Sequence, residues 1–228
     1  MEKLNELKNL IQEKSILKHP FYKAWAAGFL SQEDLRRYVR QYYHHVRAFP
    51  TYVAGIIANC ESPRLRSVLL ENLKDEEGSS PTHLDLWVDF GRSLGLTRGE
   101  MENSEVYPET RHFVDTFKHL TRNQSAPVGA TALYAYESQI PAVAAEKIEG
   151  LKQYEFGSNL DVTFFTVHQI ADVKHTADLE KVAALVDNGE GSKATVAVHQ
   201  VLNGWWGLLD GVLARSPELK EKVTACAM

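Results

Sequence analysis

Apolar side chains recur every three to four residues along almost the whole chain, which is the spacing of an amphipathic helix. Near the N-terminus, Leu4, Leu7 and Ile11 form one such apolar stripe. The β-branched cluster from Val53 to Ile57 falls within the same helical period and lacks the turn residues that would join two strands. The pattern therefore predicts an all-α fold.

A capping signal marks the first long helix. Ser31 followed by Asp34 resembles an N-cap with an acidic residue in the first turn. The apolar and aromatic segment that follows spans residues 35–60. We expect it to break near Pro50, because a proline inside a helix removes a backbone hydrogen bond and crowds the preceding turn.

Two Ser-Pro pairs predict further helix starts, because proline is favoured at the first helical position after an N-cap. These pairs are Ser62-Pro63 and Ser80-Pro81. Gly95 is expected to end the second of these helices. The other predicted helices cover residues 110–123, 127–151 with an interruption at Pro141, 161–186, 193–213 and a short segment from Pro217. Short loops join these segments, so we expect a single domain over residues 1–228, built as a bundle of about seven or eight helices.

Three residues of the metal-ligand type share one face of a predicted helix. His168, Asp172 and His175 are spaced i, i+4 and i+7, so two helical turns bring their side chains to one stripe. Phe164 and Phe165 lie nearby, so the stripe is expected to be buried, where unpaired polar groups are costly. A divalent metal would satisfy this ligand set, which suits iron with open positions for oxygen. The alternative is a solvated helix face on which two histidines fall by chance.

Further donors fall on another predicted pair of helices. Glu76 and His83 are about two helical turns apart, but Gly78 and Pro81 break the regular spacing. Glu76 could therefore end one helix while His83 begins the next. Glu77 is a competing ligand, and an ordinary charged helix end followed by a surface histidine is the alternative.

Glu137 completes the set of candidate ligands. It lies among alanine, leucine, tyrosine and isoleucine residues, where an ionised carboxylate needs a metal, a salt bridge or a hydrogen bond from a neighbouring tyrosine. Helix bundles build two-iron sites from inward-facing carboxylates and imidazoles of this kind. The imidazoles argue against a dedicated calcium or magnesium site, and zinc offers no redox chemistry. The six candidate ligands are Glu76, His83, Glu137, His168, Asp172 and His175.

The adjacent residues His44 and His45 could suggest a second metal site. Neighbouring side chains on a helix point about 100° apart, so the two imidazoles cannot easily face one ion. We expect one of them to be buried and hydrogen-bonded and the other to be solvated.

Composition narrows the class of protein by exclusion. Of 228 residues, 44% are hydrophobic, which is enough for a sizeable core without disulfides. Asp and Glu (30) outnumber Lys and Arg (25), so the chain lacks the basic footprint of nucleic-acid binding. No apolar run reaches the ~18 residues of a membrane helix, and the N-terminus lacks a signal-peptide core. Because Cys60 and Cys226 also suggest reduced thiols, we expect a cytoplasmic protein that contacts neither nucleic acid nor membrane.

Several motifs resemble those of a known family. They are HPFYKAW, RAFPTY, NLKDEEGSSPTHLDLW, LYAYESQIP with the downstream EKI, and FFTVHQIADVKH. Together they are similar to the CADD-like branch of the heme-oxygenase-like di-metal oxidases, which is related to the TenA and PqqC proteins. The resemblance covers nearly the whole chain. It implies a heme-oxygenase-like helical bundle, a homodimer, and a site with two iron ions or a manganese–iron pair.

The same resemblance implies an unusual reaction. CADD-like proteins make 4-aminobenzoate for folate biosynthesis by oxidatively excising the ring of one of their own tyrosines, with dioxygen as co-substrate and an external reductant. Tyr22, in HPFY, matches the sacrificed tyrosine. Lys147, in AAEKI, matches the lysine proposed to give the amino nitrogen, and Tyr136 matches another tyrosine associated with the site. Such a chain would be substrate and catalyst together, limited to a single turnover.

Two other classes of function remain open. One is a TenA-like or PqqC-like enzyme of the same fold that acts on a small molecule without metal. Cys60 and Cys226 lie outside the motifs, which speaks against the cysteine nucleophile of TenA chemistry, and the six candidate ligands speak against a metal-free oxidase. The other is a protein-interaction module, although no partner surface can be identified from the sequence.

Overall fold

The prediction of an all-α fold is confirmed. The computed structural model describes residues 2–184, 186 and 189–226, with side chains to residue 224, and over these residues it contains no strand. It has twelve α-helices and two short 3-10 helices in the same part of the chain, so the predicted count of seven or eight helices is wrong. Local capping interactions explain some of the helices that were not predicted. Thr97, for example, accepts a hydrogen bond from the Glu100 amide and starts a five-residue helix in a segment predicted as loop.

Short turns join the helices, which follow one another along the chain. They are α1 (Glu2–Glu13), η1 (Ile16–Lys18), α2 (Pro20–Ala26), α3 (Gln32–Ala58), α4 (Pro63–Glu77), α5 (His83–Ser93), α6 (Arg98–Glu102), α7 (Pro108–Asn123), α8 (Ala126–Glu137), α9 (Ile140–Leu151), η2 (Gly157–Asn159), α10 (Thr163–Ala183), α11 (Gly191–Ala214) and α12 (Pro217–Cys226).

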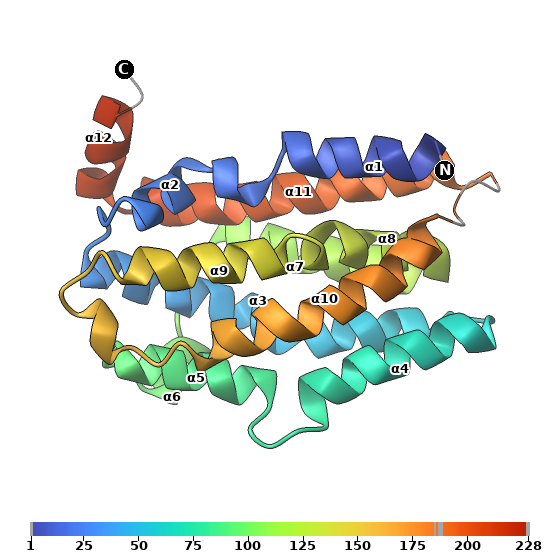
Figure 1. Ribbon diagram of the computed structural model, residues 1–228, viewed down its shortest axis with the longest axis horizontal. Helices are drawn as coiled ribbons and strands as arrows, with labels where there is room; N and C mark the ends of the chain where they lie inside the picture. The colour runs from blue at the N-terminus through green and yellow to red at the C-terminus, as the bar shows by residue number, and fades with distance from the viewer. Residues whose placement is uncertain (1, 185, 187–188, 227–228) are drawn as a thin grey trace.

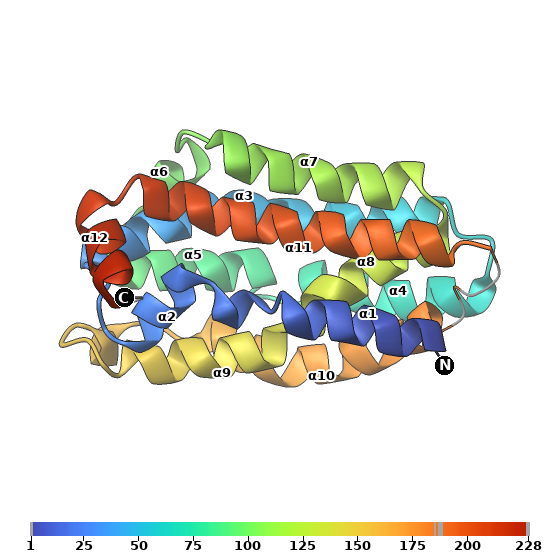
Figure 2. The same cartoon turned by 90° about the horizontal axis from the view of Figure 1, so that it is seen from above.

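The long helices run along the longest axis of the molecule, as Figure 1 shows. Seen from above in Figure 2, α7, α3 and α11 lie side by side, and α9 lies beside α10. α8 is covered by α7, α10 and α11, while α4 and α5 pack against α3 and α10. The interior enclosed by α3, α4, α5, α8 and α10 is where the predicted metal ligands come together.

The predicted break at Pro50 is wrong. α3 continues through the proline over 27 residues. The neighbouring Phe49 and Val53 are both buried in the core. Tertiary packing supplies most of the stability of helices in proteins, and here it outweighs the hydrogen bond that Pro50 cannot make.

The turn between α4 and α5 also differs in detail from the prediction. α4 begins after the predicted cap, Ser62. α5 is capped by Thr82 rather than by Ser80, because Thr82 and Asp85 form a reciprocal capping box. The first residue of α5 is therefore His83. The glycine predicted to end this helix, Gly95, does lie just beyond its last turn and has a φ of +85°.

The core is rich in aromatic side chains. Trp25, Trp87 and Trp205 are each 1% exposed or less. Cys60 is buried and is not part of a disulfide, whereas the side chain of Cys226 lies outside the described residues. Across the described segments, we find no helix with the length and apolar character needed to span a bilayer.

Candidate metal centre

α10 presents three predicted ligands to the interior. His168, Asp172 and His175 are all buried, as their shared stripe predicted. His168 Nδ1 lies 2.7 Å from the carbonyl oxygen of Phe164. A nitrogen that donates to a carbonyl leaves the other ring nitrogen as the acceptor, so Nε2 of His168 is free to face a metal.

The turn after α4 brings Glu76 and His83 together. Glu76 lies in the last turn of α4 and His83 opens α5, as the sequence suggested. Both are buried, and His83 Nδ1 lies 3.0 Å from Glu76 Oε2. The competing residue Glu77 is exposed, so it is Glu76 that faces the interior.

Glu137 is the last residue of α8 and is 2% exposed. The Asn72 side-chain amide donates to both of its carboxylate oxygens, at 3.0 and 3.2 Å. Asn72 precedes Glu76 by one turn of α4, so one helix supplies both a candidate ligand and the group that orients another candidate ligand.

His175 is oriented by Asp75, which the sequence pattern did not single out. Its Nε2 lies 2.9 Å from Asp75 Oδ2, while its Nδ1 lies 3.4 Å from Asp172 Oδ1. When the ring is neutral and Nε2 donates to Asp75, Nδ1 carries the lone pair and could bind a metal. Asp75 adjoins Glu76 in the sequence, but its position alone did not indicate a contact with α10.

The six side chains gather into two groups of three. Within each group, one ligand atom of every residue lies within 4.8 Å of the others. Each group mixes carboxylate and imidazole donors, so each could hold one divalent ion. The first group is Glu76, His83 and His168, and the second group is Glu137, Asp172 and His175.

The electrostatics of the second group fit a cation. Burial and the neighbouring charge of Asp172 raise the pKa of Glu137 to about 8. Burial lowers the pKa of His175, but the neighbouring carboxylates outweigh it and raise that pKa to about 9. Asp172 Oδ2 and His175 Nδ1 are buried and have no hydrogen-bond partner among the described residues. A divalent metal would satisfy these atoms and neutralise the carboxylates.

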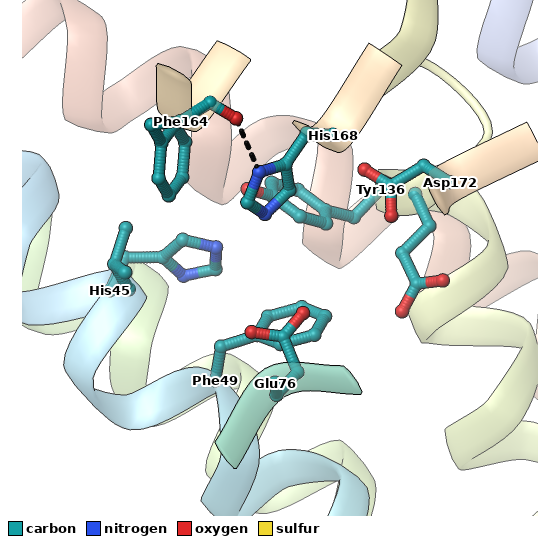
Figure 3. Close-up of a pocket in the computed structure, with 9 residues that line it drawn as sticks. His45, Phe49, Glu76, Tyr136, Phe164, His168 and Asp172 are labelled. Carbon is teal, nitrogen blue, oxygen red and sulfur yellow. Dashed lines mark hydrogen bonds between the residues drawn. The ribbon is translucent and has the colours of Figure 1, made fainter. Parts of the chain in front are cut away.

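A cavity of about 20 Å³ adjoins both groups. Figure 3 shows Glu76, His168 and Asp172 around it, together with Tyr136. A volume of this size accommodates about one water-sized molecule. The space between the candidate ligands is therefore very small.

His45, on α3, also lines this cavity. The prediction that one histidine of the pair is buried is confirmed, since His45 is 1% exposed, but neither of its ring nitrogens has a hydrogen-bond partner in the described structure. His44 is half-buried and its Nε2 lies 2.9 Å from Ser104 Oγ, so the expectation that the other histidine is simply solvated is wrong.

The three residues implied by the family resemblance lie in one buried aromatic region. The Lys147 amino group donates to the Tyr38 hydroxyl at 2.8 Å, and the Tyr22 hydroxyl lies 3.1 Å from the same oxygen. The Tyr42 hydroxyl is hydrogen-bonded to that of Tyr136. The rings of Tyr38 and Tyr42 stack with their centres 5.2 Å apart.

These four tyrosines, Tyr22, Tyr38, Tyr42 and Tyr136, form the tyrosine cluster. It extends from the cavity, which Tyr136 lines, to Tyr22 on α2. Tyr38 and Tyr42 were not predicted to matter, although their i, i+4 spacing on a helix places them on one face.

Lys147 is unusual because it is only 3% exposed. Burial lowers the pKa of its amino group to about 7. It is absent from the ion pairs formed by the described residues. Six aromatic ring centres lie 5.0–5.9 Å from its Nζ, those of Tyr22, Trp25, Tyr38, Tyr42, Trp87 and Phe165.

Comparison with known proteins agrees with a metal centre in this helical bundle. The sequence profile of a family described as iron-containing redox enzymes matches residues 36–206. The chain is 39% identical over 214 residues to the 4-aminobenzoate synthase of Chlamydia muridarum, covering 93% of this chain and 91% of that protein.

Solved structures show the same fold. The chain is similar to a TenA homologue from Pseudomonas syringae pv. tomato, with a TM-score of 0.80 and 18% identity over 92% of each chain. It is also similar to a CADD-like protein from Nostoc punctiforme, with a TM-score of 0.73 and 17% identity over 93% of this chain and all of that one. The predicted TenA-like, heme-oxygenase-like fold is thereby confirmed. Because the family profile spans most of the sequence, including the helices that carry all the candidate ligands, the chain belongs to the family of iron-containing redox enzymes.

Proposed function

We propose that this protein is an oxygen-dependent 4-aminobenzoate synthase that uses the ring of its own Tyr22 and the side-chain nitrogen of Lys147. The observation that carries the proposal is the shared contact of these two residues with one oxygen atom. The Tyr38 hydroxyl accepts a hydrogen bond from Lys147 and lies 3.1 Å from the Tyr22 hydroxyl. The name of the Chlamydia muridarum relative supports the same product.

The size of the cavity supports a substrate that is part of the chain. Pockets that bind organic ligands usually measure about 300–1,000 Å³. The cavity beside the candidate ligands measures about 20 Å³, which suits dioxygen or water better than an added aromatic molecule. Tyr22 and Lys147 are themselves 2% and 3% exposed, so both reactants are already held inside the protein.

The proposed metal centre is a pair of iron ions, or manganese and iron, held by the two groups of ligands. When bound in reduced form, the metal pair would supply the electrons with which dioxygen becomes an oxidant for a phenol ring. Asn72 and Asp75 orient the ligands Glu137 and His175 through their hydrogen bonds. An external reductant would restore the metals to the reduced form.

The tyrosine cluster can connect an oxidant formed in the cavity with the ring of Tyr22, by transfer of electrons and protons between neighbouring tyrosines. Burial raises the pKa of Tyr38, Tyr42 and Tyr136 well above the usual value, so at neutral pH each keeps its proton. A phenol that loses an electron also tends to lose its proton, and the neighbouring hydroxyls are placed to accept it. The contacts between the four rings therefore form a path from the cavity to Tyr22.

Lys147 is prepared to act as a nitrogen donor. With its pKa lowered to about 7, a large part of the amine is neutral near pH 7, and a neutral amine has the lone pair needed to attack a ring carbon once the phenol has been oxidised. The phenol oxygen would leave as water, and further oxidation by dioxygen would break the Nζ–Cε bond of Lys147 and the Cα–Cβ bond of Tyr22 to release the product. The hydrogen bond to Tyr38 fixes the nitrogen beside Tyr22.

The proposal is tested with protein made in the presence of ring-¹³C tyrosine. The purified chain is loaded anaerobically with Fe(II), with or without Mn(II), and then exposed to dioxygen and a reductant. We expect 4-aminobenzoate that carries the label, in no more than about stoichiometric amount. Repeated turnover of an added small molecule, with unlabelled product, would instead favour an ordinary oxygenase of the PqqC-like kind.

A further inference from the structure

His45 is a buried polar residue that the proposed chemistry leaves without a role. It is 1% exposed, and both of its ring nitrogens lack hydrogen-bond partners within the described part of the chain. Leaving a buried polar group unsatisfied costs about 1–3 kcal/mol. A phenylalanine would fill a similar volume without that cost, so stability alone does not account for an imidazole at this position.

Aromatic rings surround His45 on most sides. Its ring stacks on that of Phe113, with the ring centres 4.6 Å apart. It packs in a T-shaped arrangement with the ring of Tyr136, with the centres 4.8 Å apart. Tyr42 and Phe49 lie within 6 Å of the same ring. These contacts fix the orientation of the imidazole and keep bulk water away from it.

The remaining side of the ring faces the cavity. In Figure 3, the His45 side chain enters from α3 and its ring is directed toward the space between His168 and Glu76. These two residues belong to the first metal group. The cavity of about 20 Å³ is therefore lined by ligands of that group on one side and by an unpartnered imidazole on the other.

We propose that this cavity is a binding site for dioxygen and that His45 is a positioning residue, which donates a hydrogen bond to dioxygen held there. The cavity has the volume of a water-sized molecule, which also suits a diatomic one. Burial keeps the pKa of His45 far below its usual value, at about 3, so the ring is neutral near pH 7 and offers one N–H and one lone pair. The inference rests on the proposed oxygen-dependent function.

Nitric oxide, a diatomic probe that binds ferrous iron, tests this role without any product being formed. The full chain is loaded with Fe(II) under anaerobic conditions, and the N–O stretching frequency is recorded in H₂O and D₂O. For the parent protein we expect a frequency that shifts on deuteration, because a hydrogen bond reaches the bound nitric oxide. In His45→Phe we expect this shift to disappear and nitric oxide to dissociate about tenfold faster, the effect of losing one hydrogen bond.

Three comparisons make the result specific. His45→Gln keeps a donor and should recover part of the shift. His44→Phe changes the neighbouring histidine, which bonds Ser104 rather than lining the cavity, and should behave like the parent. Metal-free His45→Phe should unfold at no lower temperature than the parent, because no hydrogen bond joins His45 to another described residue. If His45→Phe does not fold, His45→Leu takes its place.

The inference is overturned if His45→Phe leaves the deuterium shift and the dissociation rate unchanged. It is also overturned if the variant binds fewer iron ions than the parent, because His45 would then be a metal ligand. Failure of the proposed function looks different: the parent would release no 4-aminobenzoate on exposure to dioxygen, while its nitric oxide complex would still show the hydrogen bond from His45.

Discussion

The side-chain nitrogen of Lys147 lies 5.4 Å from the centre of the Tyr22 ring. The two residues come from α9 and α2, which are far apart in the sequence and pack against each other. Placing an amine in an aromatic core without a carboxylate partner is unfavourable for stability. Enzymes commonly accept such a penalty where chemistry needs it, which agrees with a role for Lys147 in the reaction.

This burial gives Lys147 a measurable effect on stability. Its pKa is lowered from 10.5 to about 7 in the folded state, so between these values the unfolded chain binds a proton that the folded chain does not. The free energy of unfolding should therefore rise with pH in this window, by at most about 1.4 kcal/mol per pH unit. Well below pH 7 the lysine is charged in both the folded and the unfolded state, so the folded protein bears the full free-energy cost of burying the charged amine.

We expect metal-free Lys147→Met to be more stable than the parent, with the difference greatest below pH 7 and shrinking toward pH 10.5. Urea unfolding of both proteins at pH 6.5 and pH 9 measures it. Lys152→Met, at an exposed position just after α9, is the control and should not alter the pH dependence. If the curves of parent and Lys147→Met run parallel, the aromatic rings hold the lysine as a cation and its amine is not prepared for attack.

The sequence was most informative where one helix carries the pattern. The spacing of His168, Asp172 and His175 was enough to predict a shared buried face on α10, because helical geometry alone determines it. Glu137 could be singled out because an acidic residue in an apolar segment needs a partner. The turn between Glu76 and His83 could be inferred from the local glycine and proline.

The sequence was least informative where contacts join distant segments. Asn72 and Asp75 act on Glu137 and His175 across the bundle, and no local pattern specifies such pairs. Tyr38 likewise becomes notable only when α2 and α9 are packed around it. The break wrongly predicted at Pro50 has the same origin, since tertiary packing overrides the local preference of a proline.

Removing single ligands should distinguish the two metal groups. We expect Asp172→Ala or His175→Ala to lose the ion of the second group, and Glu76→Ala to lose that of the first. Each change should lower the metal content from about two ions to about one, measured by elemental analysis after anaerobic loading with Fe(II). His199→Ala removes an exposed histidine on α11 and serves as the control. Full metal content in a protein lacking both Asp172 and His175 would exclude the second group as a site.

Metal binding should release protons. In the metal-free protein the pKa of Glu137 is raised to about 8 and that of His175 to about 9, so at pH 7 this interacting pair of groups retains bound protons. A metal binds only the deprotonated carboxylate and the neutral imidazole, so it must displace these protons. The affinity for Mn(II) should consequently increase as the pH rises from about 6 to about 9. Calorimetric titration at pH 7 in buffers of different ionisation enthalpy gives the number of protons, and a value near zero would contradict the protonated state of the second group.

Replacing Tyr22 by phenylalanine should separate the reaction from the metal site. Tyr22→Phe keeps a ring in the same place and removes only the phenol oxygen, which among the described residues is hydrogen-bonded to Tyr38 alone. Stability should fall by about 0.5–1.5 kcal/mol, the usual contribution of a hydrogen bond. The variant should still take up two metal ions, because the tyrosine belongs to neither metal group.

The same variant should release no 4-aminobenzoate, because without the phenol hydroxyl the ring at position 22 can be neither readily oxidised nor aminated. Peptide mass spectrometry after exposure to dioxygen should show residue 22 altered in the parent and intact in Tyr22→Phe. Tyr52→Phe is a matched control, since Tyr52 is also fully buried but has a hydroxyl without a partner in the described structure. It should keep both the metal content and the product. Labelled 4-aminobenzoate from Tyr22→Phe would show that another residue supplies the ring.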